Sequence, residues 1–183
     1  KNIVEHFYNK DIKTFNYFFN SDFISISPKP IITPQLTNNS NINGPSLIKT
    51  PNFLKNKLGK YYLYFASHDG DKIKLAYSDN LNGPWNIYPL GTLQLKDTNC
   101  LTHIASPDVH IEDNQIVMYY HGDTPNGQFS FRSTSLDGIN FTPDNKVLGL
   151  FYFRVFNYLG ETYAIAKNKN IDGIVYRKEN DTF

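Results

Sequence analysis

The 183-residue sequence predicts an all-β protein built from repeats of short strands. Its composition favours pleated, half-buried surfaces, because 13 Tyr and 14 Phe bring the aromatic share to 15%. Asn-Gly and Asp-Gly turns separate short apolar runs, and several of these runs alternate with polar residues. From Asn43 onward the same order of runs and turns recurs along the chain, which indicates internal repeats rather than a single irregular sheet.

Residues 1–42 form a lead-in to these repeats. The stretch 2–20 carries apolar residues at spacings that suit either a short amphipathic helix or a strand. The prolines between residues 28 and 34 favour extended backbone, because proline lacks an amide donor and biases the preceding residue away from the helix. The polar residues 37–41 predict a loop before the first repeat.

Three units follow, and we place them at about 43–100, 101–150 and 151–183. Each unit starts with one strand, continues with a second strand and a turn, and then has a third strand. The three strands are expected at 44–49, 61–68 and 73–78 in the first unit, at 106–111, 116–121 and 129–134 in the second, and at 153–156, 162–166 and 174–177 in the third. In this alignment His68, His121 and Lys167 occupy the same place in the three units.

A period of roughly 45 to 55 residues with three or four short strands per unit is typical of β-propeller blades. A β-sandwich also supplies short strands at this spacing, but it does not explain the triplicate order of elements. Since propellers close with at least four blades, three blades leave open faces. Either the chain is an incomplete part of a larger propeller, which is the simpler explanation, or another copy completes the ring.

Charge and composition exclude several classes of partner. The net charge is +1, from 18 basic and 17 acidic residues, so there is no basic field for nucleic acid. No window approaches the roughly 18 uninterrupted apolar residues of a membrane span, so we expect no membrane partner. Cys100 is the single cysteine, which excludes an internal disulfide and any multi-cysteine zinc site. We predict no cofactor.

The candidate site lies where the first strands of the blades meet. In a propeller these strands line the central channel, and the loops at one of their ends form one face. Residues 43–46, 103–110 and 152–156 are therefore expected to converge with the ends of the second strands. The resulting polar funnel would contain one carboxylate together with imidazole, guanidinium and amide groups, contributed by Asn43, His68, His103, Asp108, His121 and Arg154.

Three phrases of the sequence carry a family resemblance. They are Gly-Pro-Ser-Leu-Ile from Gly44, Tyr-Tyr-Leu-Tyr-Phe-Ala-Ser-His from Tyr61, and Ser-Pro-Asp-Val from Ser106. Over residues 43–183 the chain resembles the five-bladed β-propeller glycosidases, which include the glycoside hydrolase family 43 arabinanases and xylosidases and the invertase-like enzymes. It resembles even more closely uncharacterised bacterial members of that superfamily. The resemblance implies about three of five blades, a sugar or oligosaccharide ligand, and an activity like that of a glycoside hydrolase.

Those glycosidases use three channel carboxylates, namely a base, an acid and a third group that tunes the acid. The resemblance places Asp108, directly after Pro107, at the tuning carboxylate. The base should directly precede the first-blade proline, where Gly44 stands, and the acid should lie four residues before Val155, where Phe151 stands. Two of the three carboxylates implied by the resemblance are therefore absent.

Three hypotheses remain open at this point. In the first, a non-standard glycoside hydrolase uses Asp108 as its key carboxylate and His103 for proton transfer, with the sugar bound by Asn43, His68, His121 and Arg154. In the second, the protein is a non-catalytic glycan-binding propeller. In the third, it is a structural module with an empty channel.

Each candidate residue also has a structural interpretation. Asp108 could cap a turn, as Asp commonly does. Arg154 lies in an apolar strand and needs a partner, for which we name Asp108. The histidines could bind a metal, but no tight ligand spacing supports this, and we predict no metal site.

Overall fold

The computed structural model describes residues 30–38, 41–170, 172–180 and 182–183, and the helix or strand predicted over residues 2–20 lies outside them. The described secondary structure belongs to the compact unit from Ile31 to Phe183. It begins with a one-turn helix, α2 (Pro34–Thr37), at whose N-terminus Thr33 Oγ1 accepts a hydrogen bond from the Leu36 amide at 3.3 Å. In the described part of the chain, no helix is both long and apolar enough to span a bilayer.

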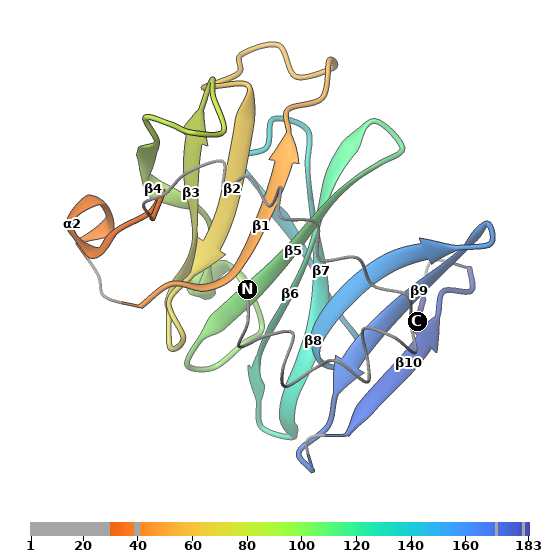
Figure 1. Ribbon diagram of the computed structural model, residues 1–183. Helices are drawn as coiled ribbons and strands as arrows, with labels where there is room; N and C mark the ends of the chain where they lie inside the picture. The colour runs from red at the N-terminus through yellow and green to blue at the C-terminus, as the bar shows by residue number, and fades with distance from the viewer. Residues whose placement is uncertain (1–29, 39–40, 171, 181) are drawn as a thin grey trace, which may run out of the picture. The chain divides into compact units, whose positions relative to one another are not determined.

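The first blade is a four-stranded antiparallel meander (Figure 1). Its strands follow one another in chain order: β1 (Asn43–Lys49), β2 (Tyr61–Ala66), β3 (Lys72–Ser78) and β4 (Asn86–Gln94). The first three agree with the predicted strands to within two residues. The fourth begins directly after Trp85 and was not placed by the sequence analysis.

The second and third blades share one continuous sheet (Figure 1). Its strands are β5 (Ile104–Glu112), β6 (Gln115–Thr124), β7 (Gly127–Ser135), β8 (Thr142–Tyr158), β9 (Glu161–Lys167) and β10 (Gly173–Arg177), paired in chain order. The 17-residue β8 pairs with β7 through residues 142–150 and with β9 through residues 151–158. One strand is thus the outermost strand of the second blade and the innermost strand of the third.

The innermost strand of every blade carries a β-bulge at the same place. The register shifts between Asn43 and Ser46 in β1, between Ala105 and Asp108 in β5, and between Phe151 and Arg154 in β8. One residue of each bulge has a left-handed backbone, with φ of 53° at Gly44, 50° at Ser106 and 64° at Tyr152. The three bulges therefore define matching positions in the three blades.

This register corrects one prediction. The last paired residue before each bulge is Asn43, Ala105 or Phe151. Its partners on the neighbouring strand are Ala66 in β2, His121 in β6 and Lys167 in β9, respectively. The prediction that His68 shares this place with His121 and Lys167 was wrong, because His68 lies two residues beyond Ala66 and outside the strand. His68 instead lies in the turn between β2 and β3 of the first blade.

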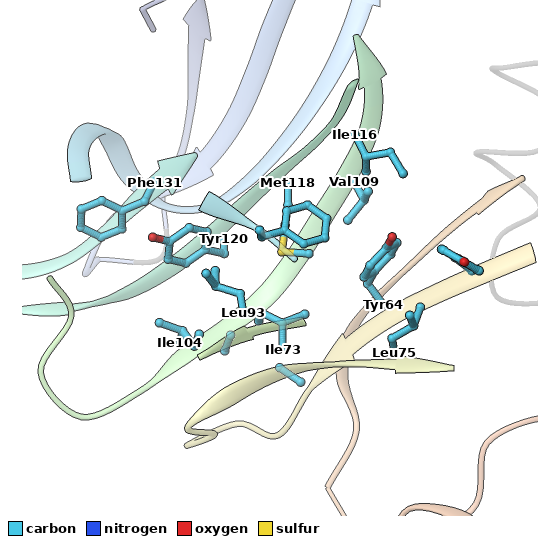
Figure 2. Packing of buried hydrophobic residues seen from close by; sticks show 14 of the residues in the cluster. Tyr64, Ile73, Leu75, Leu93, Ile104, Val109, Ile116, Met118, Tyr120 and Phe131 are labelled. Carbon is cyan, nitrogen blue, oxygen red and sulfur yellow. The ribbon is translucent and has the colours of Figure 1, made fainter. Parts of the chain in front are cut away.

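Hydrophobic packing joins each blade to the next. Side chains of the first blade and of β5 and β6 form one buried cluster between the two sheets, and a smaller cluster that includes Val117, Tyr119 and Phe153 lies between the second and third blades. Burying each large apolar side chain contributes roughly 1.5 to 3 kcal/mol, so these interfaces fix the inner strands relative to one another. Figure 2 shows the first cluster, with Tyr64, Ile73 and Leu75 on one side and Val109, Ile116 and Met118 on the other.

Candidate functional site

Polar and aromatic groups gather around the three bulges and the adjoining strand ends. We call this set the inner-strand site. It contains five of the six residues predicted for the channel funnel. Three further residues belong to it because they occupy matching register positions or contact these five directly. Its members are Asn43, His68, His103, Ser106, His121, Tyr152, Arg154 and Lys167.

A hydrogen-bonded series crosses all three blades at this site. The Asn43 amide nitrogen and His68 Nδ1 are 3.0 Å apart, and Asn43 Oδ1 accepts a 2.6 Å hydrogen bond from Ser106 Oγ. Arg154 Nη1 donates to the Ser106 carbonyl at 3.2 Å. The side chain that begins the first blade is thereby connected, through the bulge of the second blade, to the guanidinium of the third.

A second series runs through ring contacts. The His103 and His121 rings meet edge to face with centroids 5.7 Å apart, and the His121 and Tyr152 centroids are 4.4 Å apart. Lys167 Nζ lies 5.4 Å from the centroid of the Tyr152 ring. At the other end, His103 Nδ1 is 3.3 Å from Asp123 Oδ1, which also accepts the His103 amide. Imidazole, phenol and ammonium groups thus contact one another in a row beside the hydrogen-bonded series.

His121 is the most unusual group at the site. Its side chain is almost fully buried, and its Nδ1 has no hydrogen-bond partner among the described residues. Burial lowers the pKa of His121 to about 3, and the nearby positive groups of His103, Arg154 and His68 act in the same direction. The imidazole is therefore neutral near pH 7, and one of its two ring nitrogens is then a hydrogen-bond acceptor.

Asp108 connects neighbouring inner strands. Its Oδ2 accepts a 2.7 Å hydrogen bond from the Val155 amide of β8 and lies 3.0 Å from His110 Nε2. At the matching position of the first blade, Ser46 Oγ accepts the Val109 amide of β5 at 2.9 Å. Both side chains therefore accept an inner-strand amide from the following blade.

The predicted ion pair between Arg154 and Asp108 was wrong. Arg154 Nη1 donates to the carbonyl oxygens of Ser106, Phe153 and Pro107, at 3.2, 3.0 and 3.5 Å. The physical reason is the register: Arg154 occupies in the third blade the position that Asp108 occupies in the second. The adjacent Val155 amide, rather than the guanidinium, then faces the carboxylate.

The chain was compared with known proteins. No protein-family model matches it. The uncharacterised protein R118 of Acanthamoeba polyphaga mimivirus is 36% identical over 149 residues, which cover 69% of this chain and 42% of that protein.

Among solved structures, a family 43 β-xylosidase/α-arabinofuranosidase from a compost metagenome, in complex with xylotriose, superposes with a TM-score of 0.59 at 15% identity. An α-L-arabinofuranosidase from Clostridium thermocellum gives a TM-score of 0.58 at 18% identity. They cover 76% and 79% of this chain, and the chain covers 45% and 49% of theirs. The fold is part of a family 43-like β-propeller. The predicted all-β propeller class is confirmed, and the chain spans about half the length of the proteins it matches.

The inner strands of this family 43-like propeller differ from the catalytic pattern that the resemblance implies. At the position of the base, a Cβ on Gly44 would lie 2.4 Å from the Ser106 Cα, and the φ of 53° is itself unfavourable for a side chain. At the position of the acid, Phe151 is buried beside His121 with ring centroids 6.3 Å apart. Asp108 lies two residues beyond Ser106, the residue that matches Gly44 in register. The backbone of this propeller thus leaves no room for a carboxylate at position 44.

The three histidines do not form a metal centre in the described part of the chain. No group of three or more His, Cys, Asp or Glu side chains suited to an ion is found there. His68 is paired with Asn43, whereas His103 and His121 contact each other. Ser106 and Tyr152 lie within the predicted segments 103–110 and 152–156, but sequence reasoning did not single them out, because their role depends on the bulge conformation that both adopt. The position of Asp123, directly after His121-Gly122 at the end of a strand, was a usable signal for a partner of His103.

Proposed function

We propose that the protein binds a sugar or oligosaccharide at the inner-strand site. Amide, imidazole, guanidinium and ammonium groups supply the donors and acceptors that sugar hydroxyls need, and the Tyr152 ring supplies an apolar surface beside them. The observation that carries the proposal is the unpartnered, buried Nδ1 of His121, because a buried polar atom of this kind calls for a ligand partner.

Binding without standard two-carboxylate hydrolysis is the function that this geometry supports best. Hydrolysis needs one carboxyl group to protonate the leaving oxygen and another to activate water or attack. Gly44 and Phe151 stand at two of the positions, and the Asp108 carboxylate already accepts the Val155 amide. We therefore infer a glycan-binding propeller built on a glycosidase fold.

Hydrolysis with a non-standard set is the second candidate. Two carboxylate–imidazole pairs favour it, with Asp108 3.0 Å from His110 and Asp123 3.3 Å from His103. A carboxylate that orients an imidazole is a common arrangement for moving a proton. In this candidate Asp108 is the key carboxylate and His103 transfers the proton.

The test is a glycan array followed by titration calorimetry on the purified protein. Asn43→Ala removes the amide that joins His68 to Ser106, and we expect its affinity for the bound glycan to fall by about tenfold or more. The matched control is Asn52→Ala, an exposed residue beyond the opposite end of β1, and its affinity should not change. Equal affinity of both variants, or the absence of any bound glycan, overturns the proposal.

Turnover of the bound glycan separates the two candidates. Under the binding function, prolonged incubation leaves the glycan intact. Release of a reducing sugar by the protein, abolished in Asp108→Asn, would instead support hydrolysis. Circular dichroism of each variant shows whether the fold is retained.

A further inference from the structure

The third blade brings two cations to the inner-strand site. Arg154 occupies the register position held by Ser46 and Asp108 in the other blades, and Lys167 occupies the position held by Ala66 and His121. At both positions a neutral or acidic side chain is thus replaced by one that carries a positive charge. The two cations belong to paired strands, β8 and β9, and Ile165, the partner of Arg154, lies two residues from Lys167 on the same face of the sheet.

Arg154 has no carboxylate partner among the described residues. The ion pairs found there involve other cations, namely His103, His110, Arg177 and Lys178. The Arg154 side chain is exposed, and its hydrogen bonds from Nη1 go to neutral carbonyl oxygens. Contacts with carbonyl oxygens orient the guanidinium without neutralising its charge. Its other N–H donors can therefore bind an anion.

Lys167 is held in place by aromatic rings. Its Nζ lies 5.7 Å from the centroid of the Phe151 ring and 5.4 Å from that of Tyr152. In the described part of the chain it forms no ion pair. A ring face attracts the ammonium group but carries no net charge, so the positive charge is positioned without being cancelled.

The carboxylates of Asp108 and Asp123, on β5 and β6, have other partners. Asp108 accepts the Val155 amide and contacts His110. Asp123 accepts the amides of Thr102 and His103. The site thus contains two cations whose charge the described carboxylates do not satisfy, next to a neutral imidazole with a free ring nitrogen.

We propose that the inner-strand site is selective for an acidic sugar, with the carboxylate of a hexuronic acid residue bound by Arg154 and Lys167. The planar guanidinium matches the geometry of a carboxylate, and the ammonium adds a second charge-assisted contact. The amide of Asn43 and the imidazole of His68 supply polar groups for the sugar hydroxyls. This inference rests on the proposed function, because it names the class of sugar that the same site binds.

The experiment compares two probes by titration calorimetry: trigalacturonate, and the neutral trisaccharide obtained by reducing its carboxyl groups to alcohols. We expect trigalacturonate to bind about tenfold or more tightly, with an affinity that falls as NaCl concentration rises. Arg154→Gln and Lys167→Met should each weaken trigalacturonate binding about tenfold and leave the neutral probe unchanged. Lys169→Met, an exposed lysine in the loop after β9, is the matched control and should retain the preference.

The outcomes separate this inference from the proposed function. Equal affinity for both probes, or an equal loss for both in Arg154→Gln, overturns the acidic-sugar selectivity while sugar binding stands. If neither probe binds and a glycan array is also blank, the proposed function fails and the selectivity fails with it. Binding of trigalacturonate that is unaffected in Arg154→Gln and Lys167→Met places the anion elsewhere and overturns the inference.

Discussion

The two junctions between blades use the same positions for different purposes. Where the first blade faces the second, Ala66, Ile73 and Leu75 are fully buried and apolar. The residues at the matching positions of the second blade, which face the third, are His121, Ser130 and Arg132. One junction is therefore a dry hydrophobic interface, and the other contains imidazole, hydroxyl and guanidinium groups.

The contrast shows where a repeated fold can accommodate function. The first junction obtains its stability from a large cluster in which Tyr64 also donates to the Gly138 carbonyl at 2.8 Å. The second has a smaller cluster, and its polar groups need specific partners such as the 2.7 Å hydrogen bond from Ser130 Oγ to the Leu150 carbonyl. Burying polar residues at the second junction destabilises the fold unless such hydrogen-bond partners are present. The part of the site that contains His121, Tyr152 and Lys167 therefore lies at the junction with the smaller apolar cluster.

The largest expected effect is at the dry junction. Leu75→Ala removes a fully buried side chain between the first two blades, and we expect a loss of about 2 to 5 kcal/mol in the free energy of unfolding. Urea denaturation measures this loss. Leu136→Ala, at a leucine that is 76% exposed, is the control and should change stability by less than about 0.5 kcal/mol. Similar losses in both variants would contradict the assignment of this junction as the main core.

The polar junction should show its own signature in the pH dependence of stability. Because the pKa of His121 is about 3 in the folded protein and about 6.5 in the unfolded chain, the unfolded state binds more protons between these values. The stability that the neutral His121 imidazole contributes is therefore present in full above pH 6.5 and is lost as the pH falls towards 3. Between pH 6 and pH 4, the free energy of unfolding should fall by roughly 2 to 3 kcal/mol less in His121→Asn than in the unchanged protein. Urea melts of both proteins at several pH values test this, and parallel curves would contradict a buried neutral imidazole.

A smaller effect distinguishes the two side chains that accept inner-strand amides. Asp108→Ala leaves the Val155 amide without its charged acceptor, at a cost of about 1 to 3 kcal/mol. Ser46→Ala leaves the Val109 amide without a neutral acceptor, at a cost of about 1 kcal/mol. Thermal unfolding of the two variants compares them directly. The comparison between the junctions would be wrong if Ser46→Ala proved the more damaging change.

Much of the fold could be predicted from local patterns in the sequence. Alternating apolar residues and Gly-containing turns located three strands in each blade, but not β4 or residues 142–150 of β8. Neither the continuity of β8 nor the left-handed backbone of Tyr152 within it could be predicted, because both depend on pairing with β7 and β9. A tyrosine gives no local signal for such a conformation, whereas a glycine does.

The candidate site was predicted only in outline. Its location followed from the blade order, but its contacts depend on register across blades. The pairing of Arg154 with carbonyl oxygens, and of Asp108 with the Val155 amide, depends on bulges that advance each inner strand by one residue. The different place of His68 has another origin, because strand ends are less well specified by sequence than strand interiors.

The long strand β8 has a consequence for how the protein opens. Its residues 142–150 and 151–158 belong to different blades, so neither blade can lose its sheet without disturbing the other. The chain passes from the first blade to the second through the 3₁₀ turn Leu95–Asp97 and the loop that follows it, without a shared strand. We expect native-state hydrogen exchange to show the amides of β7, β8 and β9 opening as one cooperative unit.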